Sequence, residues 1–278
     1  MTLPTFLVIG ALKAGTTSLW TYLRGHPDVY MPEEKELRFF VEQHNWDRGL
    51  DWYEGRFSAS GGAHAIGEAS PAYTIATSFP GVPARIASLI PEAKLIYVVR
   101  HPVERMRSHY LQRRVDGTER LPPERAFLED LDYLHTSRYA FQIDLYLEHF
   151  ARDQILIITT EELREDRLET LQRAFGFIGV DPDVVPAGID EVRNRSAEKE
   201  IRSPVVAGIR ERSAYRAAAR VVPTPLRRLH HRLSTRYMSI SDVRLPVDVE
   251  ARIVDALRPD VERLRALMDP SFDGWGIL

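Results

Sequence analysis

Cysteine is absent from this 278-residue chain, so disulfide bonds, thiol catalysis and zinc sites built on cysteine are excluded. The chain also lacks an apolar run of the roughly 20 residues that cross a bilayer. Its first apolar run, residues 6–12, is short, ends at Lys13 and follows no basic segment. We therefore expect a cytoplasmic protein without a secretory signal or a membrane anchor.

Neither sign of charge is in excess, because 37 basic residues face 40 acidic ones. A dedicated nucleic-acid-binding domain is normally strongly basic, so we expect no nucleic-acid partner. Hydrophobic residues make up 44% of the chain and charged residues 28%, values that exclude a wholly disordered protein. No linker divides the sequence, and we predict a single domain over residues 1–278.

Lysine is scarce, since only four lysines accompany the many arginines. A general preference for arginine explains the scarcity. Two of the four, Lys13 and Lys35, nevertheless lie in the segments that carry the candidate chemistry. Their retention invites a functional reason.

Short apolar strands alternate with helical segments along most of the chain. We expect strands at residues 6–9, 94–99 and 154–159, followed by helices at residues 18–24, 102–114 and 167–177. This alternation predicts an α/β fold in which a central parallel sheet is flanked by helices on both faces. Near the C-terminus, residues 247–268 predict two amphipathic helices around Pro259, and we expect Trp275 to pack the chain end onto the body.

Residues 201–237 contain nine arginines and a single acidic residue, Glu211, which gives a local net charge of +8. Pro223 and Pro225 divide the segment, which we expect to form two helices as an Arg-rich C-terminal cap. Arginines at helical spacing are typical of a solvated face. The same charge would also suit an acidic acceptor or a peripheral contact with an anionic membrane, and the sequence leaves these alternatives open.

The segment between the first strand and the first helix reads G-A-L-K-A-G-T-T, from Gly10 to Thr17. Small residues let backbone N–H groups approach an anion, and the helix that follows directs its positive end toward it. In the Walker A pattern the lysine follows the second glycine, whereas here Lys13 precedes Gly15. A tight turn with a surface lysine would have the same pattern, so the segment alone indicates an anion site without identifying it.

The end of the second strand carries a further signal. P-loop kinases and ATPases generally place an aspartate there to hold Mg²⁺, but this strand is followed by Arg100, His101 and Pro102. An arginine repels a metal ion and attracts a phosphate, so we predict an anion bound by protein cations and no metal. Ser108, two turns into the following helix, is placed to reach the same phosphate as Arg100.

Together these motifs resemble the sulfotransferases that use 3′-phosphoadenosine 5′-phosphosulfate (PAPS). Residues 6–19 are similar to their 5′-phosphosulfate loop and residues 100–110 to their 3′-phosphate motif. Residues 26–29, 35–40 and 49–53 are most similar to the branch that contains the Golgi heparan sulfate sulfotransferases. The resemblance covers nearly the whole chain and implies a P-loop-like domain.

The resemblance implies a role for each matching residue. Lys13 would contact the oxygen that bridges to the sulfate, and Arg100 and Ser108 would hold the 3′-phosphate of PAPS and of the product PAP. The 5′-phosphate would lie against Ala14, Gly15, Thr16, Thr17 and Ser18. Residues 194–203 resemble the stretch that closes over the nucleotide, which makes Arg202 a further candidate for the 3′-phosphate.

Glu36 matches the glutamate that serves as catalytic base in the heparan sulfate branch. An acceptor hydroxyl must lose its proton as it attacks, so a carboxylate within hydrogen-bond reach is needed. A solvated acidic loop is the competing interpretation, because Glu33 and Glu34 lie beside it. Histidine is the competing base, as in cytosolic members of the family. Of the candidates His44, His101 and His109, the last two flank the phosphate-binding residues and we expect them to be structural.

Two departures from the heparan sulfate branch limit what the resemblance implies. Residues 67–73 fit the next family segment, but Ala69 stands where those enzymes have a lysine that assists substrate and sulfate, and the chain lacks their paired cysteines. We therefore expect a bacterial-type enzyme acting on a hydroxyl of a sugar, a glycolipid or a natural product. Two alternatives are an NTP-dependent kinase with a divergent P-loop and a non-catalytic nucleotide-binding regulatory module.

Overall fold

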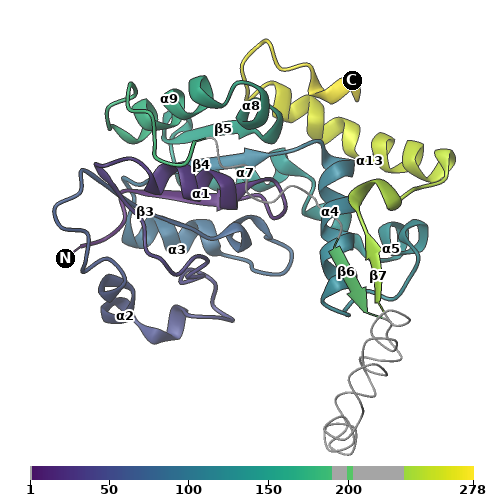
Figure 1. The fold of residues 1–278 in the computed structure, drawn as a ribbon, viewed down its shortest axis with the longest axis horizontal. Coiled ribbons are helices and arrows are strands. Elements are labelled where there is room, and N and C mark those ends of the chain that lie inside the picture. Colours follow the sequence, from purple (N-terminus) through teal and green to yellow (C-terminus); the bar gives the residue numbers. More distant parts are fainter. Residues whose placement is uncertain (1, 190–198, 203–234) are drawn as a thin grey trace, which may run out of the picture.

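The computed structural model describes residues 2–189, 199–202 and 235–278. Its centre is a five-stranded parallel sheet in the order β2-β3-β1-β4-β5 (Figure 1). The strands are β1 (Phe6–Gly10), β2 (Val29–Tyr30), β3 (Ala65–Ala69), β4 (Lys94–Val99) and β5 (Ile155–Thr159). A separate antiparallel pair is formed by β6 (Lys199–Arg202) and β7 (Thr235–Met238).

Helices cover both faces of the central sheet. Helix α1 packs beside α9 on one face and α3 packs beside α7 on the other (Figure 1). The helices are α1 (Thr16–Arg24), α2 (Leu50–Gly55), α3 (Val82–Leu89), α4 (Pro102–Val115), α5 (Pro123–Glu129), α6 (Leu131–His135), α7 (Tyr139–Leu147), α8 (Thr160–Glu165), α9 (Arg167–Ile178) and α13 (Val247–Arg265). The predicted fold class, a parallel sheet flanked by helices, is confirmed.

The two central strands explain where a site can form. Strand β1 is buried along its whole length and β4 is buried after its first residue, as expected for parallel strands covered on both faces. Phe6 pairs with Lys94, and Val99 pairs with Thr159, so β1, β4 and β5 end at the same side of the sheet. In open parallel sheets, ligands bind beyond this carboxyl end of the strands.

The three predicted strands and the helices that follow them are confirmed, with boundaries that differ by no more than two residues. Strand β3 was not predicted, because its sequence Ala-Ile-Gly-Glu-Ala has little β propensity. Its place in the sheet requires small residues. A Cβ on Gly67 would lie 2.2 Å from Cζ of Phe6, so the ring of the neighbouring strand occupies the space of a side chain.

In the C-terminal part, the predicted helix pair around Pro259 is wrong, and the predicted Arg-rich cap is contradicted only at its two ends. Residues 247–265 form the single helix α13, which continues through Pro259. One buried apolar face runs along it from Val249 to Leu264 and packs against α4 and α7. This packing outweighs the roughly 3 kcal/mol that an internal proline costs a helix. Residues 201–202 and 235–237 lie in β6 and β7 rather than in helices, and the remainder of the predicted Arg-rich cap, residues 203–234, lies outside the described residues.

The prediction for Trp275 is confirmed. Its Nε1 donates to Oε2 of Glu161 at the start of α8 (3.3 Å), and its ring lies 6.2 Å from the ring of His101 and 6.1 Å from that of Tyr139. These contacts hold the chain end against the body. Within the described ranges, no helix is both long enough and apolar enough to cross a membrane.

Candidate functional site

The segment after β1, residues 10–18, lies at the carboxyl end of the sheet and is called the anion loop below. Gly15 has a φ of 93°, a left-handed conformation that favours glycine, and α1 begins at the next residue. No described side chain caps this helix end, and its first turn contains no acidic residue. The Thr160 hydroxyl holds the loop by donating to the carbonyl of Ala14 at 2.6 Å. Helix N-termini left uncapped in this way are suited to anions.

Lys13 and Arg100, both predicted from the sequence, are brought together by the fold. Lys13 has a φ of 70°, and its Nζ donates to Oε1 of Gln112 on α4 at 3.5 Å. Arg100, directly after β4, donates from Nη1 to the carbonyl oxygen of Lys13 at 3.5 Å. Two cations therefore flank the anion loop on the side of α4.

Lys35 reaches the anion loop from a different segment of the chain. Its Nζ donates to Oγ1 of Thr17 at 2.8 Å and to Oγ1 of Thr16 at 3.3 Å. The same nitrogen lies 3.7 Å from Oε1 of Glu36. Burial lowers the pKa of Lys35, and the neighbouring carboxylate partly opposes that effect. The scarcity of lysine pointed to this residue, but the sequence did not predict its position.

Glu36 lies at a sharp turn beside the end of β3. Its φ is 63°, and its N–H donates to the carbonyl of Ala69 at 3.0 Å. Oε2 accepts from Nη2 of Arg38 at 2.6 Å, so the carboxylate lies between two cations. The side chain is 31% exposed, against 94% for Glu33 and 61% for Glu34. Glu36 is thus distinct from the two solvated glutamates, and the Nζ of Lys35 contacts both its carboxylate and the loop threonines.

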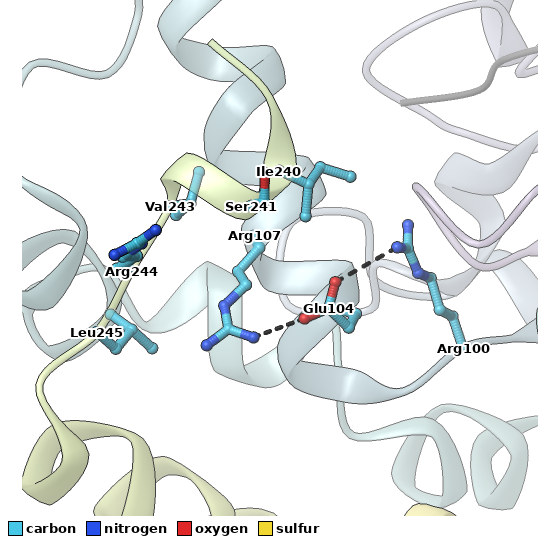
Figure 2. Close-up of a pocket in the computed structure, with 8 residues that line it drawn as sticks. All are labelled: Arg100, Glu104, Arg107, Ile240, Ser241, Val243, Arg244 and Leu245. Carbon is cyan, nitrogen blue, oxygen red and sulfur yellow. Dashed lines mark hydrogen bonds and ion pairs between the residues drawn. The ribbon is translucent and has the colours of Figure 1, made fainter. Parts of the chain in front are cut away.

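A cavity of about 550 Å³ lies beside Arg100, between α4 and residues 240–245 (Figure 2). Three arginines line it, Arg100, Arg107 and Arg244, together with Glu104, and a second carboxylate, that of Glu250, pairs with Arg107 at 2.7 Å. Figure 2 shows Glu104 between two of them, at 3.6 Å from Nη2 of Arg100 and 2.6 Å from Nη1 of Arg107. The cavity is therefore positively charged and continuous with the Arg100 side of the site.

Residues 3–207 match the family model described as the sulfotransferase domain. The chain belongs to the sulfotransferase domain family. The predicted family and the class of enzyme that it implies are thereby confirmed. Members generally take the sulfuryl group from PAPS.

Two relatives and one solved structure are similar to this sulfotransferase. It is 34% identical over 186 residues to mouse heparan sulfate glucosamine 3-O-sulfotransferase 6, a match that covers 64% of this chain and 52% of the relative. It is 32% identical over 202 residues to human bifunctional heparan sulfate N-deacetylase/N-sulfotransferase 3, covering 65% of this chain and 23% of that protein. The match therefore spans about half the length of the first relative and less than a quarter of the second. A sulfotransferase structure from Alicyclobacillus acidocaldarius has a TM-score of 0.69 at 26% identity, and the match covers 99% of each chain.

Glu68 on β3 is a residue of this sulfotransferase that the sequence analysis missed. It is 2% exposed and accepts hydrogen bonds from the hydroxyls of Tyr53 (3.0 Å), Tyr73 (2.5 Å) and Ser70 (2.8 Å). Burial raises the pKa of Glu68, and the three hydroxyl donors oppose the shift. Ser70 Oγ in turn accepts from the N–H of Arg38 at 3.0 Å. The buried carboxylate thus anchors the turn that presents Glu36. The sequence signal that could have identified Glu68 is an acidic residue among small apolar ones.

The candidate histidines differ in burial, since His109 is largely buried and His44 is exposed. The ring of His109 on α4 packs 5.0 Å from that of Tyr133, and that of His44 lies 5.4 Å from the ring of Phe79. Burial, together with nearby cationic side chains, lowers the pKa of His109 to about 3. General bases work best with a pKa near the operating pH, so His109 is poorly suited to that role. A structural role for His101 and His109 stays a prediction.

Two further predicted nucleotide contacts lie on α4 or on the strand beside it. Ser108 is 8% exposed on α4, one helical turn from Glu104, which pairs with Arg100, and one turn from Gln112, which accepts from Lys13. Arg202 lies on β6, which packs beside α4, but its side chain is outside the described part of the structure. Both contacts stay predictions, and residues 240–245 were not predicted to lie near Arg100.

Proposed function

We propose that this protein transfers the sulfuryl group of PAPS to an acceptor hydroxyl, with Glu36 as the general base. The observation that carries the proposal is the placement of a carboxylate beside an uncapped anion loop. Lys35 spans the two, at 2.8 Å from Thr17 and 3.7 Å from Glu36. The family and the chemistry of these side chains support the same reaction.

In this reaction the acceptor oxygen attacks sulfur as the bond from sulfur to the bridging oxygen of the 5′-phosphate breaks. The acceptor proton passes to Glu36, and PAP leaves with the bonding electrons on its phosphate oxygen. Negative charge therefore grows at the anion loop, where Lys13 and the N-terminus of α1 stabilise it. As in phosphoryl transfer, alignment and electrostatics carry most of the catalysis.

The 3′-phosphate is assigned to the Arg100 side of the site, with Ser108 and Arg202 as further candidates. The cavity beside Arg100 supports this assignment, because Arg244 adds positive charge to it, whereas Arg107 is paired with Glu104 and Glu250. Glu104 holds Arg100 and Arg107 in place through its two ion pairs. These contacts use protein cations alone and require no metal ion.

The acceptor is proposed as a hydroxyl of a carbohydrate, a glycolipid or another small molecule. The relatives named above include a heparan sulfate glucosamine sulfotransferase, which supports a carbohydrate. Ala69, in place of the lysine that the resemblance leads one to expect, argues against a heparan-like polymer. A cytoplasmic location and the absence of a nucleic-acid partner stay predictions.

Calorimetric titration with PAP in the absence of metal tests the donor, beside titrations with 5′-AMP and with ATP plus Mg²⁺. We expect PAP to bind tightly and 5′-AMP much more weakly. Arg100→Ala should reduce PAP affinity at least tenfold, the usual effect of losing a charged hydrogen bond. A preference for ATP with Mg²⁺ would contradict the proposal and favour a kinase.

A further inference from the structure

Lys35 contacts both the anion loop, on the donor side of the site, and Glu36, on the acceptor side. Its ammonium group binds the hydroxyls of Thr16 and Thr17 on the anion loop and forms an ion pair with Glu36. Its side chain is only 16% exposed. An ammonium has three N–H donors, and beyond the two threonines the third is directed to Glu36, where a sulfuryl oxygen bound between the loop and Glu36 would share or replace that contact.

An ammonium at this position is electrostatically costly in the protein alone. Lys35 lies at the N-terminus of α1, where the helix dipole is positive. Burial adds to the cost, and Glu36 is the carboxylate that it pairs with. An anion bound between the loop and Glu36 would offset each of these terms.

The reaction places such an anion between these groups. In an in-line transfer the sulfuryl group lies between the leaving phosphate and the acceptor oxygen. The anion loop holds the first and Glu36 takes the proton from the second, so the sulfuryl oxygens pass beside the group that touches both. We propose that Lys35 binds the sulfuryl oxygens of PAPS as a second catalytic cation, while Lys13 serves the leaving oxygen.

This inference rests on the proposed function, and it is tested by comparing PAPS with PAP, which lacks the sulfuryl group. Calorimetric titrations use wild-type protein, Lys35→Met and Lys35→Arg. Lys35→Met should lower the affinity for PAPS by tenfold to a hundredfold, the range for a charged hydrogen bond, and that for PAP by less than threefold. Lys35→Arg keeps the charge and should recover a large part of the PAPS affinity.

Lys94→Met is the matched control. Lys94 begins β4, at the opposite end of the sheet from the anion loop, and should bind PAPS and PAP as the wild type does. Lys35→Gln, which can still hydrogen-bond to the threonines, replaces Lys35→Met if the latter melts at a lower temperature.

The outcomes separate the inference from the function it rests on. Equal losses of PAPS and PAP affinity in Lys35→Met would assign Lys35 to the 5′-phosphate or to loop structure and overturn the inference. Unchanged PAPS affinity would overturn it as well. A wild-type protein that binds neither nucleotide would overturn the proposed function itself, and the inference with it.

Discussion

Acidification should destabilise this protein through His109, which the fold holds neutral. The side chain lies on α4, where Nδ1 is buried and has no hydrogen-bond partner in the described part of the chain. Burial is the largest cause of its lowered pKa, and the positive charges of Arg105, Arg113 and Lys13 add to it. In mildly acidic solution His109 is therefore protonated in the unfolded chain but stays neutral in the native state.

The size of the effect follows from the two pKa values. His109 has a pKa of about 3 in the native state, and an unfolded histidine has one of about 6.5. Because the native pKa is depressed, the unfolded state binds the extra proton, and stability falls as pH drops below about 6.5. At about pH 4.5, roughly two pH units below the unfolded pKa, protonation of His109 has stabilised the unfolded state relative to the native state by about 3 kcal/mol.

Urea unfolding at about pH 7.5 and pH 4.5 measures this loss in the wild type and in His109→Phe. Phenylalanine keeps a ring against Tyr133 and cannot titrate. We expect the free energy of unfolding of the wild type to fall by about 3 kcal/mol more than that of the variant, since other titrating groups contribute equally to both. The same pH dependence in both proteins would refute the reasoning.

Three further predictions concern Glu36, Glu68 and Gly67. Glu36→Gln should lower turnover with a true acceptor by roughly 10²- to 10⁴-fold while calorimetry finds PAP affinity unchanged; unaltered turnover would favour a non-catalytic nucleotide-binding module. Glu68→Ala leaves three buried hydroxyls without their acceptor and should lower the free energy of unfolding by about 3 kcal/mol or more, with Glu68→Gln less affected; chemical denaturation of both tests the order. Gly67→Ala directs a methyl group at the ring of Phe6 and should cost about 1–3 kcal/mol in the same assay, so a neutral effect would contradict the packing of β1 on β3.

Much of the fold could be predicted because its signals are local. Strands β1, β4 and β5 are short apolar runs, and the helices after β1 and β4 begin after a glycine loop or at a proline. Strand β3 carries no such signal. The ring of Phe6 leaves no room for a side chain at Gly67, and Glu68 is buried because distant hydroxyls donate to it. The sequence predicted a break at Pro259, but helix α13 is continuous. The packing on α4 and α7 that keeps it continuous is tertiary, so the local sequence does not reveal it.

The candidate site divides in the same way. Lys13, Arg100 and the glycines of the anion loop belong to segments whose order along the chain already indicates an anion site. The turn at Glu36 was different, because its positive φ is maintained by the bond to Ala69 and by the Glu68–Ser70 contacts beneath Arg38. These partners lie some 30 residues away in sequence.

The sequence by itself determined three of the five strands, the anion loop and the family, because burial preference, glycine conformation and helix polarity act over a few neighbouring residues. The tertiary structure alone decided that Lys35 would reach Thr17 and that Arg107 and Arg244 would join Arg100 around one cavity. Those contacts join segments that meet only when the chain has folded. A charge on a side chain is visible in the sequence, but its field acts at a place that the packing of distant elements defines.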